Sequence, residues 1–224
     1  RTVLAATAAM RQAVDEVSGL LRGHLTVGMV TACTVTALFD ALAAFHRAYP
    51  GVTITLVEDD SVALTERVRS GTADAALIGA AGSTPRGLAA LPLVSERLVA
   101  AVPVDHPGFP ERNRLTLTDL TAFPLVCMPQ GTGIRAVFDQ ACAARGLTPD
   151  IALEASAPAA VADLAVRGLG VAILSETIAA AHRERLRAFL IEDIESPALL
   201  ALIWKPAPSP ALGEFLRHCR SAFG

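Results

Sequence analysis

The segment from Gly131 to Ala136 (GTGIRA) has the residue types and spacing of a nucleotide-phosphate loop. It fits the pattern G-x-G-x-x-A, follows a predicted strand and opens a predicted helix. Glu154 stands near the end of the next strand, where a dinucleotide fold places the carboxylate that binds a ribose. Two extra residues, Pro129 and Gln130, lengthen the turn, and the motif lies in the middle of the chain. Both features argue against a dinucleotide site. A dinucleotide-binding enzyme that uses Gly131–Ala136 is therefore kept only as the less favoured alternative.

The same loop could hold a smaller anion. Glycine residues allow close backbone approach, the N-terminus of the following helix supplies N–H donors, and Arg135 adds a charge that suits a carboxylate. The competing interpretation is that Arg135 faces solvent or pairs with Asp139, one helical turn further on. The sequence leaves these roles of Arg135 open.

Other reactive residues do not assemble into a recognisable catalytic or metal-binding set. The run Glu58-Asp59-Asp60 could bind a cation or an amine, although such a run more often caps the helix that follows it. None of the five histidines has the H-x-x-x-H or H-E-x-x-H spacing of a metal site, and no serine lies in a G-x-S-x-G turn. We therefore expect a binding protein that is not an enzyme and has no metal or cofactor.

Composition limits the partners of the chain. Its 224 residues carry a formal net charge of −3 and contain no run of Lys or Arg, so the chain by itself is not expected to hold a nucleic-acid backbone. Its apolar runs are broken well short of the ~18 residues that a membrane span needs. The four cysteines form no C-x-x-C pair, and no secretory signal is visible. These features predict reduced thiols, a cytoplasmic location and no membrane partner.

Two similar successions of strands and helices position these residues. The expected strands span residues 25–29, 53–57, 75–78, 125–128, 151–155 and 171–174. The helical patterns between them span residues 35–49, 62–69, 134–145 and 159–167. Each β-α-β-α-β unit predicts a parallel sheet, and ligands of such sheets bind beyond the carboxyl ends of the strands.

The remaining segments connect or extend these two units. The long β-type stretch 88–102 could cross from one lobe to the next. Further elements are expected at 176–187 (helix), 189–191 and 199–204 (strands) and 210–223 (helix). Residues 2–22 repeat apolar side chains at alternating spacings of four and three. This pattern is typical of a helix that pairs with a partner helix, or equally of one that folds onto its own domain.

Six segments in this order resemble the effector-binding domain of LysR-type transcriptional regulators. They are LRGHLTVG, AFHRAYPGVTITLVEDDS, RSGTADAALIG, LVAAVPVDHPG, LTLTDLTAFPLV and LAVRGLGVAILSE. The resemblance runs from Arg22 to Gly224, and residues 1–22 resemble the end of the family's dimerising linker helix. It implies two Rossmann-like α/β lobes joined by crossing strands, with a fold similar to type 2 periplasmic binding proteins. Lobe I would comprise 24–95 and 198–224, and lobe II 96–197.

The resemblance also implies a site for a small-molecule effector in the cleft between the lobes. The residues that match the family's effector loops are Val30, Thr31, Ala32, Cys33, Thr34, Gly79, Ala80, Met128, Gln130, Gly131, Thr132, Arg135, Ser156 and Ser175. Many relatives have polar side chains where this chain has Ala32 and Ala80, and proline where it has Ser175. The pocket is therefore expected to be more apolar than theirs.

The leading hypothesis is an effector-sensing domain that binds a small carboxylate metabolite and modulates transcription as part of a homodimer or homotetramer. The winged helix-turn-helix domain that precedes this region in the family is not among the 224 residues, so DNA binding is implied for the parent protein only. The alternative of another class is a free-standing solute receptor of the same fold. No pattern in the sequence names the effector or the target genes.

Overall fold

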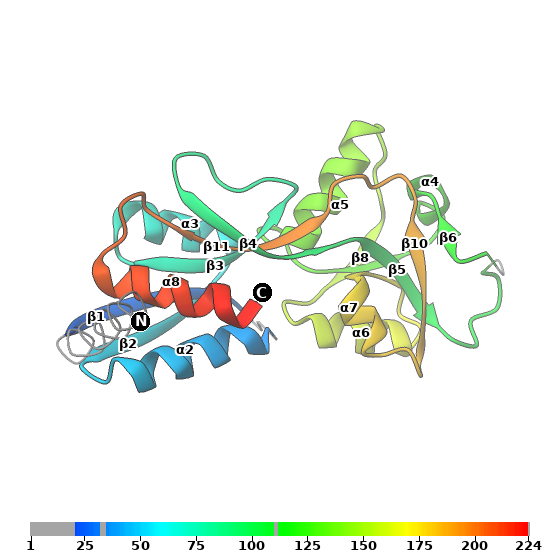
Figure 1. Ribbon diagram of the computed structural model, residues 1–224. Helices are drawn as coiled ribbons and strands as arrows, with labels where there is room; N and C mark the ends of the chain where they lie inside the picture. The colour runs from blue at the N-terminus through cyan, green and yellow to red at the C-terminus, as the bar shows by residue number, and fades with distance from the viewer. Residues whose placement is uncertain (1–20, 32–34, 110–111, 224) are drawn as a thin grey trace, which may run out of the picture.

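The computed structural model describes residues 21–31, 35–109 and 112–223, which form two lobes lying side by side (Figure 1). Lobe I consists of strands β1 (Gly23–Val30), β2 (Val52–Asp59), β3 (Ala75–Ala81), β4 (Ala89–Glu96) and β11 (Ala198–Trp204) and helices α2 (Thr36–Ala48), α3 (Ser61–Ser70) and α8 (Pro210–Phe223). Lobe II consists of strands β5 (Leu98–Pro103), β6 (Arg114–Leu115), β7 (Leu125–Cys127), β8 (Ile151–Glu154), β9 (Val171–Ser175) and β10 (Leu186–Ile191) and helices α4 (Leu117–Leu120), α5 (Gly133–Ala144), α6 (Pro158–Val166) and α7 (Glu176–Ala180). The strand orders are β2-β1-β3-β11-β4 and β6-β10-β5-β9-β7-β8.

Lobe I is built around the first predicted β-α-β-α-β unit. β1 pairs in parallel with β2 and with β3, because each helix carries the chain back to the same end of the sheet. β11 and β4 extend the sheet as antiparallel strands. α2 and α8 lie side by side (Figure 1), and the rings of Phe45 and Phe215 meet edge to face between them, 5.7 Å apart. A separate cluster around Leu64 and Val68 packs α3 against the sheet, so lobe I has two apolar layers.

Lobe II repeats this arrangement with the second predicted unit. β7 pairs in parallel with β8 and β9, and β5 runs antiparallel to both β9 and β10. Phe138 of α5 and Phe189 of β10 belong to one core cluster, and Val161 of α6 belongs to another. α4 begins at a capping box, in which Thr116 and Asp119 satisfy each other's backbone N–H groups. The predicted α/β class with two lobes is confirmed.

Two connections cross between the lobes. The predicted long β-type stretch is divided at Arg97 into β4 in lobe I and β5 in lobe II. The chain returns between the end of β10 at Ile191 and the start of β11 at Ala198. Figure 1 shows both connections passing between the lobes next to each other. Lobe II is thus joined to lobe I through two neighbouring segments.

One predicted helix was wrong in extent. The expected helix over 176–187 ends at Ala180 as α7, because Leu186 begins β10 and pairs with Pro103 of β5. The expected strand at 189–191 correspondingly starts three residues earlier, at Leu186. The predicted helix over 2–22 lies almost wholly outside the described residues. None of the described helices is both long and apolar enough to cross a membrane.

Candidate functional site

The two lobes touch where the end of β3 meets the start of α5. A Cβ atom placed on Gly79 would lie only 2.8 Å from the backbone nitrogen of Gly133. A Cβ placed on Gly133 would lie 2.7 Å from the nitrogen of Ala80 and 2.8 Å from the carbonyl carbon of Gly79. Side-chain atoms do not pack at such distances, so the two backbones are in direct contact. The predicted site residues Gly79, Ala80, Gly131 and Thr132 therefore lie at one meeting point of the lobes.

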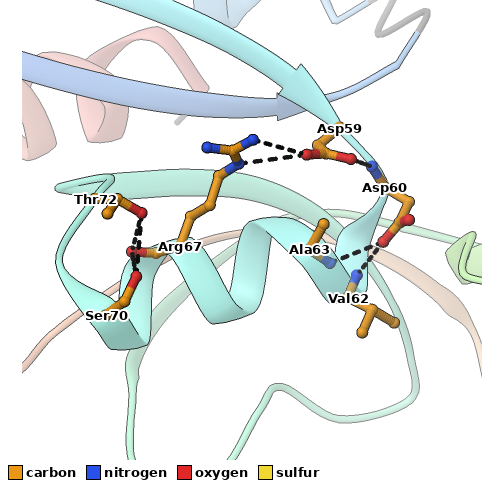
Figure 2. Close-up of polar contacts among 7 residues, drawn as sticks. All are labelled: Asp59, Asp60, Val62, Ala63, Arg67, Ser70 and Thr72. Atoms are coloured by element: carbon orange, nitrogen blue, oxygen red, sulfur yellow. Dashed lines mark hydrogen bonds and ion pairs between the residues drawn. The ribbon is translucent and has the colours of Figure 1, made fainter.

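The N-terminus of α3 lies beside this contact in lobe I, because the N–H of Gly79 donates to Ser61 in its first turn. Figure 2 shows the hydrogen bonds that cap this end of α3. Asp60 caps the helix, and its Oδ1 accepts hydrogen bonds from the N–H groups of Val62 and Ala63, both at 2.8 Å. Asp59 pairs with Arg67, whose Nη2 lies 3.1 Å from Asp59 Oδ2. Asp60 thus caps α3 and Asp59 pairs with its Arg67, in agreement with the helix-capping interpretation of the acidic run.

The last turn of α3 is closed by the residues that follow Arg67. The carbonyl oxygen of Arg67 accepts hydrogen bonds from the hydroxyls of Ser70 and Thr72 (Figure 2). Gly71 adopts a left-handed φ of 83°, the usual conformation of a helix C-cap. α3 is therefore capped at both ends, by Asp60 at its start and by Gly71 at its end, and its first turn lies beside the contact between the lobes.

Two residues at the first turn of α3 were missed as site residues. Ser61 is 7% exposed, and its Oγ accepts a hydrogen bond of 3.0 Å from the N–H of Gly79. Asp60 faces lobe II, because a Cβ on Gly131 would lie 3.6 Å from its Cβ and Cγ. The signal available in the sequence was their position directly after β2, at the same sheet edge as Gly79.

The loop that begins α5 satisfies its own polar groups. Thr132 Oγ donates to the carbonyl oxygen of Pro129 at 2.9 Å and accepts from the N–H of Arg135 at 3.4 Å. Gly131 has φ of +88°, in the region that favours glycine. The N-terminal amide of α5, at Gly133, faces the backbone of Gly79 in the other lobe.

The structure decides between the open roles of Arg135. The guanidinium is buried, and its Nε donates to Asp139 Oδ1 at 2.8 Å. Its Nη1 donates to the carbonyl oxygen of Met128 and to the carboxylate of Glu154. Burial by itself would lower the pKa of this group, but the hydrogen bonds and charges of Glu154 and Asp139 outweigh it and raise the pKa. The pairing with Asp139 is confirmed, and Arg135 joins α5 to the ends of β7 and β8.

This geometry removes the basis of the dinucleotide alternative. The carboxylate of Glu154, which would bind a ribose, is held by Arg135. The N-terminus of α5, where a pyrophosphate would lie, is covered by the backbone of Gly79 and Ala80. GTGIRA is therefore a helix start packed against the neighbouring lobe.

The other predicted site residues lie at strand ends but not all in one group. Val30 packs beside the α3 cluster, and the N–H of Thr31 donates to the carbonyl oxygen of Asp59 at 3.2 Å. Met128 is buried and Gln130 is exposed. The hydrogen bonds among the described residues do not join Ser156, after β8, or Ser175, at the end of β9, to the Gly79–Gly133 contact. Ala32, Cys33 and Thr34 lie outside the described residues.

Three of the cysteines are buried free thiols. Burial raises the pKa of Cys127 to about 12, that of Cys142 to about 11 and that of Cys219 to about 12. Thiols with these pKa values stay protonated at neutral pH and are weak nucleophiles. Cys127 and Cys142 belong to the apolar core of lobe II, and Cys219 belongs to that of lobe I.

Two α/β lobes of like topology, joined by two crossing connections and in contact at their strand ends, define a type 2 periplasmic-binding-like domain. Comparison with known proteins identifies the family. Residues 18–224 match the LysR substrate binding domain, so the chain belongs to this family.

Individual relatives agree with this assignment. The HTH-type transcriptional regulator CysB of Burkholderia cenocepacia is 32% identical over 164 residues, which cover 73% of this chain and 52% of CysB. A probable hydrogen peroxide-inducible genes activator of Mycobacterium leprae is 29% identical over 198 residues, 88% of this chain and 60% of that protein. The chain thus spans little more than half the length of these two curated relatives.

A solved structure shows the same fold. The effector binding domain of QuiR in complex with shikimate superposes with a TM-score of 0.74. The superposition covers 91% of this chain and 98% of that domain, at 16% sequence identity.

Proposed function

We propose that this chain is the effector-sensing part of a LysR-type transcriptional regulator. A small molecule would bind between the lobes, beside the first turn of α3, the ends of β1 and β3 and the start of α5. The observation that carries the proposal is the contact of Gly79 and Ala80, at the end of β3 in lobe I, with Gly133 at the start of α5 in lobe II. A ligand in this position contacts both lobes, so its binding energy can favour one lobe arrangement over another.

We propose a carboxylate effector that is not bound by the Arg135 guanidinium. That group already donates to two carboxylates and to the carbonyl oxygen of Met128. The carboxylate would instead be bound by backbone N–H groups and hydroxyls at the strand ends. The candidate contacts remain Val30, Thr31, Ala32, Cys33, Thr34, Gly79, Ala80, Met128, Gln130, Gly131, Thr132, Ser156 and Ser175. Shikimate, the ligand in the QuiR complex, is itself a small carboxylate.

The chain is proposed to act within a homodimer or homotetramer. Phe39 on α2 and Leu56 on the edge strand β2 are apolar side chains of lobe I that are 40% and 41% exposed, and we propose that a second copy of the chain covers them. Size-exclusion chromatography with light scattering tests this, and Phe39→Ser combined with Leu56→Thr is expected to shift the mass toward the monomer. DNA binding would belong to a winged helix-turn-helix domain of the parent protein, which would be cytoplasmic and without catalytic activity.

The proposed division of the chain places 24–95 and 198–224 in lobe I and 96–197 in lobe II. The change of sheet between Glu96 and Leu98 and between Ile191 and Ala198 supports it, except that Glu96 itself pairs within the sheet of lobe I. Limited proteolysis tests it: the first cuts are expected in loops within a lobe or at these two junctions, and both lobes should remain associated afterwards.

Calorimetric titration tests the sensing proposal directly. Shikimate and a set of small mono- and dicarboxylates are titrated into the chain and into an Ala80→Trp variant, which fills the end of β3. Ala143→Trp, on the exposed side of α5, is the matched control. Binding that is lost in Ala80→Trp and kept in Ala143→Trp supports the site, whereas binding that survives in both variants contradicts it.

The native gene upstream of Arg1 tests the class of protein. An open reading frame that encodes a helix-turn-helix domain running into Arg1–Arg22 supports the regulator. A cleavable signal peptide at that place would instead support a free-standing solute receptor of the same fold.

A further inference from the structure

Gly79 and Gly133 are positions where a side chain is excluded by contact with the other lobe and not by the backbone φ angle. Glycines elsewhere in the described chain, such as Gly71, Gly131 and Gly168, have positive φ angles. Gly79 and Gly133 do not: Gly79 pairs with Leu200 inside the sheet, and Gly133 is the first residue of α5. Any residue could adopt these conformations, so what the positions require is the absence of a Cβ atom.

Backbone atoms of the opposite lobe fill the space that a Cβ atom on Gly79 or Gly133 would occupy. A Cβ on Gly79 would meet the nitrogen and Cα of Gly133 at 2.8 and 3.1 Å, and a Cβ on Gly133 would meet the backbone of Gly79 and Ala80 at 2.7 to 2.9 Å. The obstructing atoms are all backbone, which cannot turn aside as a side chain can. The requirement is therefore reciprocal and acts between the lobes.

The contact lies beside the connections that join the lobes. β11, which follows the second connection, is the neighbour of β3 in the sheet, and it contacts α5. At Gly79 and Gly133 themselves the two lobes meet through backbone atoms, and the lobe I side chains beside this point that join the lobe II core cluster are the small Ala81 and Ala198, so no large side chains of the described residues interdigitate there. A backbone contact beside the two crossing connections allows lobe II to rotate while it fixes the distance between the two lobes.

We propose that Gly79 and Gly133 are positioning residues that form the bearing on which lobe II rotates against lobe I. They set the closest approach of the lobes and hence the depth of the effector cleft. The meaning of that depth for ligand selection rests on the proposed function, but the bearing itself does not. A methyl group at either position must part the backbones by about 0.7 Å to reach an ordinary contact of 3.4 Å. Across a lobe with a radius of about 13 Å, this displacement corresponds to a rotation of about 3°.

Residual dipolar couplings of the full 224-residue chain, without effector, measure the relative orientation of the lobes. We expect Gly79→Ala and Gly133→Ala each to rotate lobe II by about 3° from its orientation in the wild type. Gly213→Ala is the first control, because α8 leaves open space there and the lobes should not move. Gly131→Ala is the second: it adds backbone strain at positive φ, but its Cβ would keep ordinary contacts of 3.6 Å, so stability should fall without rotation.

The proposal is overturned if either alanine variant folds with the wild-type orientation, since the loop would then absorb the added atom. A variant that does not fold is replaced by the other one. The wild type provides a measurement that needs no variant: nuclear Overhauser contacts between the Hα protons of Gly79 and Gly133 must be present, and their absence rejects the bearing. Binding of the same set of carboxylates is measured separately in the wild type and in each folded variant, because a rotation in the variants without binding of any of them to the wild type would contradict the proposed function and leave the bearing intact.

Discussion

Arg135 and Glu154 are 19 residues apart in the sequence and form an ion pair in which the arginine side chain is 8% exposed and the glutamate side chain 47%. The same guanidinium holds Asp139 and the carbonyl oxygen of Met128. One side chain thus ties the start of α5 to the ends of two strands beneath the proposed cleft.

Arg135→Gln is expected to destabilise the chain by about 2 to 3 kcal/mol. It leaves two carboxylates near each other without a cation and a carbonyl group without its donor. The cost stays below that of a fully buried pair because Asp139 and Glu154 are partly exposed. Urea denaturation measures the change. Arg167→Gln is the control, because its exposed ion pair with Asp163 contributes at most about 1 kcal/mol. Equal losses in both variants would contradict the bracing role of Arg135.

Asp60→Ala is expected to lower stability by about 1 kcal/mol, because the N–H groups of Val62 and Ala63 lose their acceptor. Asp60→Asn keeps a side-chain oxygen and should cost much less. Thermal denaturation of the two variants makes the comparison. A loss of equal size in both would mean that the charge of Asp60, rather than its hydrogen bonds, stabilises the structure.

His218 makes the stability of lobe I depend on pH. Its Nε2 is buried and has no hydrogen-bond partner among the described residues, and the ring meets those of Phe45 and Tyr49 edge on. Burial and then the charge of Arg217 lower the pKa of His218, while Glu214 opposes them. The unfolded chain therefore binds this proton more readily, and stability is expected to fall as pH drops through the ordinary value near 6.5.

Urea denaturation at pH 7.5 and pH 5.5 tests this dependence, and His218→Phe should reduce the difference between the two pH values. Glu214 does not interfere with this test, because its carboxylate contributes to the pH dependence only at lower pH. Its pKa is lowered, first by the hydrogen bond from the Tyr49 hydroxyl, so the stability that it contributes is present above its ordinary value of 4.5 and lost as pH falls below it. If the difference in stability between pH 7.5 and pH 5.5 is unchanged in His218→Phe, a group other than His218 causes the pH dependence.

The buried thiols are expected to react slowly with Ellman's reagent. In a Cys33→Ser variant, Cys127, Cys142 and Cys219 should react only as fast as the chain opens, because burial raises the pKa of each to about 11 or 12. In 6 M urea, which unfolds the chain, all three thiols should react at once. Rapid reaction of any of the three in the native chain would contradict the burial of that thiol.

The sequence predicted the repeated β-α-β-α-β units because apolar periodicity and helix-ending glycines such as Gly71 and Gly146 are local signals. It failed at 181–187, where a helical pattern yields to the pairing of Leu186 with Pro103, a partner far away in the chain. It left the role of Arg135 open for the same reason: Asp139 is visible one turn away, but Glu154 comes close only through the pairing of β7 with β8.

The strand ends and the family resemblance proposed the candidate site, but they did not predict the contact between Gly79 and Gly133. Gly133 stood out in the G-x-G-x-x-A pattern and Gly79 in the family resemblance, but nothing in the sequence paired them, since the need for each glycine arises from the other across two lobes. Asp60 was recognised as a helix cap or as part of a carboxylate run that could bind a cation, and its proximity to lobe II depends on how the lobes are joined.

The two crossing connections also make lobe II a continuous insertion within lobe I. Glu96 at the end of β4 pairs with Ala198 at the start of β11, so the chain leaves and re-enters lobe I at opposing positions of two antiparallel strands. A two-residue hairpin turn could bridge this gap. The sheet of lobe I thus needs no strand from lobe II, and lobe II enters and leaves through a single pair of neighbouring positions.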